Sequence, residues 1–293
     1  MSRDHASDYN SVTTARCERA LVTLLGDLGP WRERVYLVGG LAPRYIVGEL
    51  PAGVTPHIGT TDVDLVIGLA LGDDTPETYR TLETNLKQSG FQSETSFRWT
   101  RLVDGVRVQV EFLCETAEVE PGRIFKPKGE AVGSGLGAFN VRGAQLAASD
   151  FTEHPVEAER LDSGGLSTVS VRVCGLLPYV VLKILAFQER HDNKDVYDLV
   201  FCLLNVGDGP AAAGSTAAAS PVAGHPQVAA ALDLLAERFV DVDHDGPVAY
   251  AAFLAGDGAG EAADRLRREA VAAVRGFFTA FNAGAAGARP PRQ

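Results

Sequence analysis

Two carboxylates interrupt an apolar run at residues 59–68, which read GTTDVDLVIG. The pattern predicts a β-strand at 62–71, and because side chains alternate between the faces of a strand, Asp62 and Asp64 point the same way. The strand rise separates them by about 7 Å, where they repel each other unless a cation, a backbone cap or an ion pair compensates. Oxygen ligands alone select hard cations, so the pair predicts a site for Mg²⁺ or Mn²⁺.

A third carboxylate, Glu111, lies in a predicted β-hairpin. Strands at 96–103 and 106–115 are joined by Asp-Gly, a strong turn signal between alternating runs. Glu111 is out of phase with the apolar positions of its strand, so it can face the same site if that strand pairs beside 62–67. Three carboxylates on adjacent strands could hold two divalent ions for in-line phosphoryl transfer.

A glycine pair precedes the acidic strand. The stretch RVYLVGG at 34–40 predicts a buried strand that ends at Gly39 and Gly40, and a helix is expected at 41–50. Backbone N–H groups at such a helix start can approach a phosphate. The alternative interpretation is a strand end with two solvated aspartates, and the order of a Gly-Gly exit followed by the D-x-D strand favours the functional one.

A second group of charged residues lies on a predicted helix at 177–192. Lys183, Phe187 and Arg190 share one face by their i, i+4, i+7 spacing. Two cations on one face could hold a triphosphate, with Arg giving bidentate contacts and Lys a point charge. The alternative is a surface helix with ordinary ion pairs such as Lys194–Asp198.

Two aspartates follow on a helix predicted at 193–207. Asp195 and Asp198 share a face by i, i+3 spacing. One of them could orient Lys183 or Arg190, or accept the proton of an attacking hydroxyl.

These motifs resemble a known family. VGGLAPRYI followed by TTDVDLVIG looks like the signature of the nucleotidyltransferase superfold shared with DNA polymerase beta. KILAFQERHDNKDVYDL resembles the K-x-x-A-x-x-x-R and K-D-x-x-D-L signature of the AbiEii-type nucleotidyltransferase toxins, which include the mycobacterial MenT enzymes. The resemblance covers residues 34–204. It implies magnesium-dependent transfer of a nucleotide from an NTP, by the toxin half of a two-gene system whose members in some cases modify the acceptor end of tRNA.

Carried over by position, the resemblance gives roles to seven residues. Asp62 and Asp64 would bind metal, and Gly39 and Gly40 match the glycine motif. Lys183 would contact the triphosphate, and Arg190 and Asp198 match the arginine and the final carboxylate of the second motif. For this reason Asp198 is preferred over Asp195 as the functional carboxylate. The expected catalytic set is Asp62, Asp64, Lys183 and Asp198, with Glu111 as a further metal ligand.

The chain departs from the family pattern in two ways. The connection at 41–61 between the glycines and the D-x-D strand is long. Relatives often carry an Arg shortly before that strand, whereas this chain reads His57, Ile58 and Gly59. We therefore expect this phosphate contact either to be missing or to be supplied by Arg44, and His57 reads as an ordinary loop residue.

The organisation predicted is a mixed α/β protein. In the amino-terminal half we expect a catalytic domain at 1–175 with a nucleotidyltransferase-type mixed sheet. In the carboxy-terminal half we expect a helical domain at 176–293. Residues 116–146 read as loop with some strand, and the low-complexity stretch at 208–224 reads as a surface linker.

Composition narrows the class of protein. The 293 residues are 45% hydrophobic and carry a formal net charge of -11, which argues against wholesale coating of nucleic acid but allows a local basic cleft. The four cysteines follow no zinc or disulfide pattern. A secretory signal and a bilayer-spanning run are both absent from the sequence, so we expect a cytoplasmic protein with no membrane partner.

The expected partners are an NTP, RNA (tRNA in particular) and a cognate antitoxin. Transfer to a small molecule such as an aminoglycoside, or to a protein, remains an alternative, as does a non-catalytic nucleotide-binding module. A weaker prediction is a basic rim for RNA phosphates with interleaved aromatic side chains that stack bases, against the alternative of an ordinary amphipathic hairpin and a solvated loop. That rim comprises Arg98, Arg101, Lys126, Lys128 and Arg142, with Phe97, Trp99 and Phe125.

Overall fold

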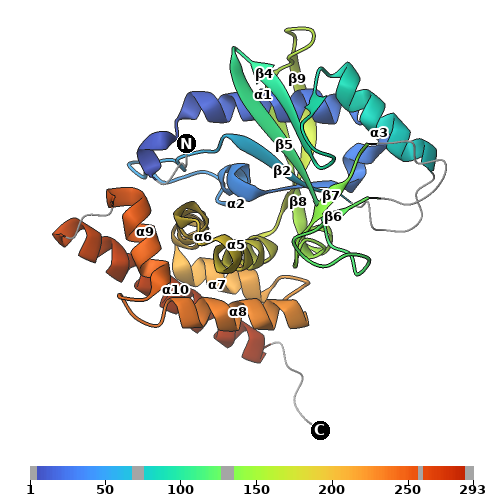
Figure 1. The fold of residues 1–293 in the computed structure, drawn as a ribbon. Coiled ribbons are helices and arrows are strands. Elements are labelled where there is room, and N and C mark those ends of the chain that lie inside the picture. The colour runs from blue at the N-terminus through green and yellow to red at the C-terminus, as the bar shows by residue number, and fades with distance from the viewer. Residues whose placement is uncertain (1–4, 68–75, 127–134, 257–259, 288–293) are drawn as a thin grey trace. The chain divides into compact units, whose positions relative to one another are not determined.

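The computed structural model describes the chain in four ranges, 5–67, 76–126, 135–256 and 260–287 (Figure 1). It is 51% helical and 20% strand, with a mixed sheet in the amino-terminal half and helices in the carboxy-terminal half, which confirms the predicted mixed α/β class. The chain forms two compact units. The sheet unit comprises Asn10–Ala42 and Gly59–Cys174, and the helical unit comprises Met1–Tyr9, Pro43–Ile58 and Gly175–Gln293.

The sheet unit is built on a mixed sheet. Within the described residues the main path has the strand order β3-β4-β5-β2-β1-β9-β8, and β7 pairs with both β5 and β6. The strands are β1 (Val35–Val38), β2 (Asp62–Ile67), β3 (Gln92–Ser93), β4 (Arg98–Val103), β5 (Val106–Cys114), β6 (Ile124–Phe125), β7 (Ala138–Asn140), β8 (Phe151–Glu159) and β9 (Leu166–Cys174).

The predicted hairpin is present, and its second strand pairs with the acidic strand, which the sequence analysis had left open. β4 and β5 are antiparallel, and their turn has Asp104 at φ 49° and Gly105 at φ 76°, the left-handed conformations that an Asp-Gly hairpin turn requires. β2 lies between β5, to which it is parallel, and β1, to which it is antiparallel. The acidic strand is therefore central in the sheet.

One face of this sheet is apolar. Val63, Leu65, Phe112 and Trp99 share that face and are completely buried. Helix α1 (Ser11–Asp27) packs its own buried apolar side chains on it and contacts β2, β4, β5, β8 and β9. The remaining helical segments of the unit are η2 (Gly29–Arg34), η3 (Gly39–Leu41), α3 (Pro76–Gln88) and α4 (Leu146–Ser149).

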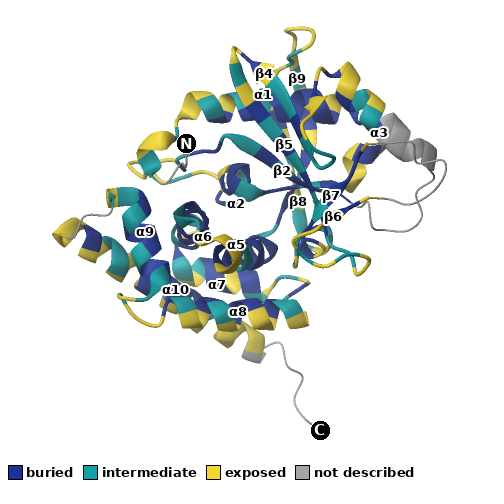
Figure 2. Ribbon diagram, in the orientation of Figure 1, coloured by how far each residue is buried: buried dark blue, intermediate teal, exposed yellow. Residues whose placement is uncertain are grey.

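The helical unit has an α5–α6 hairpin at its centre, dark blue in Figure 2 where its residues are buried. His191 ends α5 in the left-handed conformation, and the Asp192 side chain caps α6 by accepting from Lys194 N. The described segments are η1 (Ala6–Asp8), α2 (Pro43–Ile46), α5 (Leu176–Arg190), α6 (Asn193–Asn205), α7 (Pro210–Ala218), α8 (Pro226–Arg238), α9 (Asp245–Ala255) and α10 (Glu261–Gly287).

The stretch at 208–224 is not a surface linker, and this prediction was wrong. It contains α7, whose Ala213, Gly214 and Ala217 are buried against α10. A Cβ on Gly214 would lie 2.9 Å from Ala280 Cβ, so the small residues allow the two helices to approach closely. Composition alone suggested low complexity, but small residues also fill tight helix interfaces.

Other boundaries also differ from the predictions. The helix expected at 41–50 is only the four-residue α2, and the stretch at 116–146 holds β6, β7 and the start of α4. β8 was not predicted. Two segments of the expected amino-terminal domain, Met1–Tyr9 and Pro43–Ile58, group with the helices rather than with the sheet.

The four cysteines are buried and form no disulfide, in keeping with small core residues. None of the helices in the described ranges combines the length and the apolar composition that a bilayer-spanning segment needs.

Candidate functional site

The two aspartates of the D-x-D motif lie on the polar face of β2. Both are half-buried, whereas Val63 and Leu65 on the opposite face are fully buried, so the alternation predicted from the sequence is present. The strand register extends this polar face sideways. Asp62 pairs with Gln109 of β5, and side chains at paired positions share a face.

A row of three charged residues crosses the polar face. Asp64 is the register partner of Glu111 on β5, and Glu111 is the register partner of Arg98 on β4. The Arg98 Nε donates to Glu111 Oε1 at 2.6 Å. The sequence analysis placed Glu111 beside the acidic pair only if its strand paired with β2, and the structure shows that pairing and adds a guanidinium to the row.

Gly39 lies directly against the second aspartate. It has φ +66°, and a Cβ at this position would lie 2.6 Å from Asp64 Cγ. Glycine is therefore needed twice here, for its backbone conformation and for the space beside the carboxylate. Gly40 is buried next to it in η3. The glycine motif and the D-x-D motif are one local arrangement.

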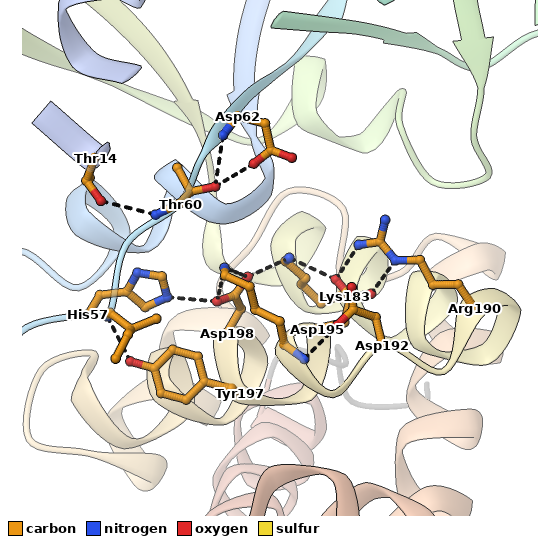
Figure 3. Close-up of polar contacts among 12 residues, drawn as sticks. Thr14, His57, Thr60, Asp62, Lys183, Arg190, Asp192, Asp195, Tyr197 and Asp198 are labelled. Atoms are coloured by element: carbon orange, nitrogen blue, oxygen red, sulfur yellow. Dashed lines mark hydrogen bonds and ion pairs between the residues drawn. The ribbon is translucent and has the colours of Figure 1, made fainter. Parts of the chain in front are cut away.

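The carboxylate of Asp62 is held by its own chain (Figure 3). The Thr60 hydroxyl donates to Asp62 Oδ1 at 2.5 Å. Thr60 in turn is fixed to α1, because its N–H donates to Thr14 Oγ1 at 3.1 Å. This chain of contacts orients the carboxylate from behind, in the way that outer residues orient metal ligands.

The chemistry of this face fits a hard divalent cation. Asp62, Asp64 and Glu111 offer only oxygen donors, which suits Mg²⁺ or Mn²⁺, and the missing Cβ of Gly39 lets the Asp64 carboxylate lie directly against the backbone. Among the described residues no group of three or more His, Cys, Asp or Glu side chains is already gathered in a coordinating arrangement.

The residues of the second motif form a buried ionic cluster in the helical unit (Figure 3). Asp198 is completely buried and receives four contacts. Lys183 Nζ lies 2.7 Å from its Oδ2, Lys194 Nζ lies 2.8 Å from both oxygens, and His57 Nε2 lies 2.8 Å from Oδ1. A carboxylate has about four lone-pair sites, so Asp198 is saturated by these partners.

Asp195 links this cluster to the surface. It accepts from Lys183 Nζ at 3.0 Å and binds the Arg190 guanidinium bidentately, with both contacts at 2.7 Å. Lys183 is 7% exposed, whereas the Arg190 side chain is 59% exposed. Lys183 is therefore enclosed by carboxylates, whereas the Arg190 side chain lies half in solvent.

His57 and Tyr197 are members of the site that the sequence analysis did not select. His57 stacks on Tyr197 and meets Phe201 edge-on, and the Tyr197 hydroxyl accepts from Ile58 N at 3.0 Å. His57 read as an ordinary loop residue, and this was wrong. The available signal was its place just before the D-x-D strand, but its partner lies 141 positions away.

The charge states in the cluster follow from burial and pairing. Burial alone would raise the pKa of Asp198, but the charges of Lys183 and Lys194 and the bond from His57 outweigh it, so this pKa lies well below its usual value. Burial alone would lower the pKa of Lys183, but Asp198 and Asp195 raise it above its usual value.

His57 behaves differently. Burial lowers its pKa below 6.5, although the hydrogen bond to Asp198 opposes this. His57 is therefore neutral at pH 7, and its Nε2 carries the proton because a carboxylate only accepts.

The remaining predicted residues are placed as follows. Arg44 is exposed on α2. Trp99 and Phe125 are buried and cannot stack bases, so that part of the basic-rim prediction was wrong. Arg101 is tied to the carbonyl oxygens of Ser89 and Leu161. Lys126 and Arg142 are exposed, and Lys128 lies outside the described residues.

The predicted site residues thus fall into two groups. The sheet unit brings together Gly39, Gly40, Asp62, Asp64 and Glu111, and the helical unit brings together Lys183, Arg190 and Asp198.

In comparisons with known proteins, no protein-family model matches the chain, and no curated protein sequence matches it.

Proposed function

We propose that this chain is a magnesium-dependent nucleotidyltransferase that moves a nucleoside monophosphate from an NTP to an acceptor hydroxyl. The acceptor oxygen attacks the α-phosphorus, a new P–O bond forms, and the bond to the leaving pyrophosphate breaks. The observation that carries the proposal is the polar sheet face, where Asp62 and Asp64 point the same way with Glu111 in register beside them and Gly39 against Asp64.

The chain's own residues have distinct roles in this proposal. A bound Mg²⁺ would supply positive charge that offsets the charge developing on the phosphate. Asp62 and Asp64 would hold it, and Thr60 keeps the Asp62 carboxylate in one orientation. Gly39 allows the backbone to lie beside Asp64 without displacing it.

Lys183 and Asp198 receive narrower roles than the motif alone suggests. Lys183 has carboxylate partners for two of its three N–H donors among the described residues, which leaves one donor for a phosphate oxygen. Asp198 accepts four contacts, so it is suited to positioning Lys183 and not to taking the proton of an attacking hydroxyl.

The acceptor and the biological setting rest on the family resemblance. We propose RNA, and the acceptor end of tRNA in particular, as the acceptor, and an antitoxin as the cognate partner. Binding of RNA should weaken steeply with salt, because phosphate contacts release counterions.

The test is incubation of the full chain with each α-labelled NTP, Mg²⁺ and total RNA, with the label followed on a gel and pyrophosphate measured separately. We expect incorporation that Asp62→Ala abolishes and that Asp233→Ala, a change at an exposed aspartate of α8, leaves intact. Undiminished incorporation by Asp62→Ala would defeat the assignment, and label on a small molecule or a protein would replace RNA as the acceptor.

One observation favours a second candidate. Because Lys183 is almost fully buried among carboxylates, the chain could be a nucleotide-binding module without catalysis. Such a module would bind NTP in the presence of Mg²⁺ but release no pyrophosphate with any of the four nucleotides or any acceptor.

A further inference from the structure

Arg98 occupies a position on the polar sheet face that no motif predicts. Arg98 and Asp64 are both register partners of Glu111, on either side of β5. Two strand spacings separate them, which places their Cα atoms about 10 Å apart. Its side chain is 34% exposed, and that of its partner Glu111 is 18% exposed. Arg98 is therefore accessible at the edge of the acidic pair.

The guanidinium of Arg98 is held through Nε, which leaves its two terminal amino groups available for a ligand. Only Nε contacts Glu111, and the two terminal amino groups have no hydrogen-bond partner in the described parts of the chain. The Phe97 ring lies 5.5 Å from the guanidinium carbon and supports it. A guanidinium fixed through Nε presents its terminal N–H groups in the geometry that matches a phosphate.

The geometry points to Arg98 as a phosphate-binding residue that Glu111 positions, with a phosphate of the nucleoside triphosphate as its ligand. This inference rests on the proposed function and deepens it. It supplies a phosphate contact from the sheet unit itself, where the sequence analysis looked to Arg44. It also assigns Glu111 to Arg98 and leaves metal binding to Asp62 and Asp64.

The same sheet contains a matched pair without the aspartates. Arg172 Nε donates to Glu153 Oε1 at 3.1 Å, and its guanidinium lies 5.2 Å from the Phe151 ring. The two residues are register partners on β9 and β8, so charge, pairing and aromatic support resemble those of Arg98. Arg172→Ala is therefore a control for loss of a cross-strand ion pair.

The experiment measures binding of the α,β-methylene analogues of the four NTPs to the full chain by calorimetry, with Mg²⁺ present. We expect Arg98→Ala to weaken the best analogue about ten- to a hundredfold, the effect of a lost charge-assisted contact. Arg98→Lys should recover only part of this, because it lacks the fork. Arg172→Ala should bind as the unaltered protein does, and melting curves should confirm that each variant is folded.

A second measurement separates Glu111 from the metal ligands. Binding of Mn²⁺ alone, followed by electron paramagnetic resonance, should be lost in Asp62→Ala and retained in Glu111→Gln, while Glu111→Gln still weakens the analogue. Loss of Mn²⁺ in Glu111→Gln, or full analogue affinity in folded Arg98→Ala, would overturn the inference and leave the proposed function standing. If the unaltered protein binds no analogue, the proposed function fails and this inference fails with it.

Discussion

His57 and Asp198 form a hydrogen bond of 2.8 Å between completely buried groups that lie 141 positions apart in the sequence. The bond joins the loop before β2 to α6, and both residues belong to the helical unit. Asp198 also holds Lys183 and Lys194. Removing any member therefore leaves a charge or a polar atom without one of its partners in a region that water does not reach.

Stability should fall as the pH is lowered through the usual range of histidine. The pKa of His57 is lowered in the fold, so below pH 6.5 the unfolded chain takes up a proton that the folded chain resists. The paired Asp198 and Lys183 titrate far outside this window and contribute a constant amount. Melting temperatures at pH 7.5 and 5.5 should differ more for the unaltered protein than for His57→Gln.

The pKa of His154 on β8 is also lowered by burial, so His154 adds to the pH dependence of stability. Melting His154→Gln at the same two pH values measures that contribution separately. Because His154 is present in both proteins of the first comparison, its contribution cancels there. An identical pH response in His57→Gln and the unaltered protein would show that His57 does not titrate as described.

Asp198→Asn should destabilise the protein by about 3–5 kcal/mol, because it leaves two buried ammonium groups facing a neutral amide. Urea unfolding would measure the loss in free energy of unfolding. Asp241→Asn is the comparison, since this aspartate is exposed and pairs only with His244 and a nearby backbone N–H among the described residues. A loss in Asp198→Asn no larger than in Asp241→Asn would contradict the buried cluster.

Gly39→Ala should weaken metal binding as well as stability. The left-handed backbone costs about 1–2 kcal/mol for alanine, and the new Cβ would push Asp64 aside. Gly122→Ala carries the same backbone cost at φ +79° with nothing within 4 Å of the added atom. Mn²⁺ affinity should therefore drop in Gly39→Ala alone, and an equal effect in both variants would exclude steric displacement of Asp64.

Gly214→Ala should destabilise the helical unit by about 1–3 kcal/mol, because the added methyl would overpack the α7–α10 interface. Thermal unfolding gives the shift. Gly224→Ala, with open space around the added atom, should change little. A gain in stability from Gly214→Ala, as expected for a solvent-exposed helix, would show that the interface is loose.

The sequence was informative where the signal is local. The Asp-Gly turn at Asp104 predicted the hairpin, and the period-two alternation predicted which way Asp62, Asp64 and Glu111 point. The ion pair Lys194–Asp198, which belonged to the alternative interpretation of a surface helix, also forms because it needs only one turn of α6, but both residues are buried. In each case the spacing within a few residues determines the geometry.

Contacts between distant segments could not be predicted in this way. Whether Glu111 lies beside Asp64 depends on β5 pairing with β2, and alternation within one strand says nothing about its neighbour. His57 looked like any loop histidine until its partner in α6 was known. The burial of Lys183 likewise depends on what packs over α5, because helical periodicity identifies a face but not its covering.

The division of the chain has a consequence for attempts to take the protein apart. A fragment that starts at residue 176 keeps Asp198 but loses His57, Ile58 and the rest of Pro43–Ile58, and the amino-terminal fragment keeps those residues away from their helices. Neither product of such a cut matches a unit of the fold. A chimera joined near residue 175 would therefore have to preserve both members of the His57–Asp198 pair to keep this buried contact.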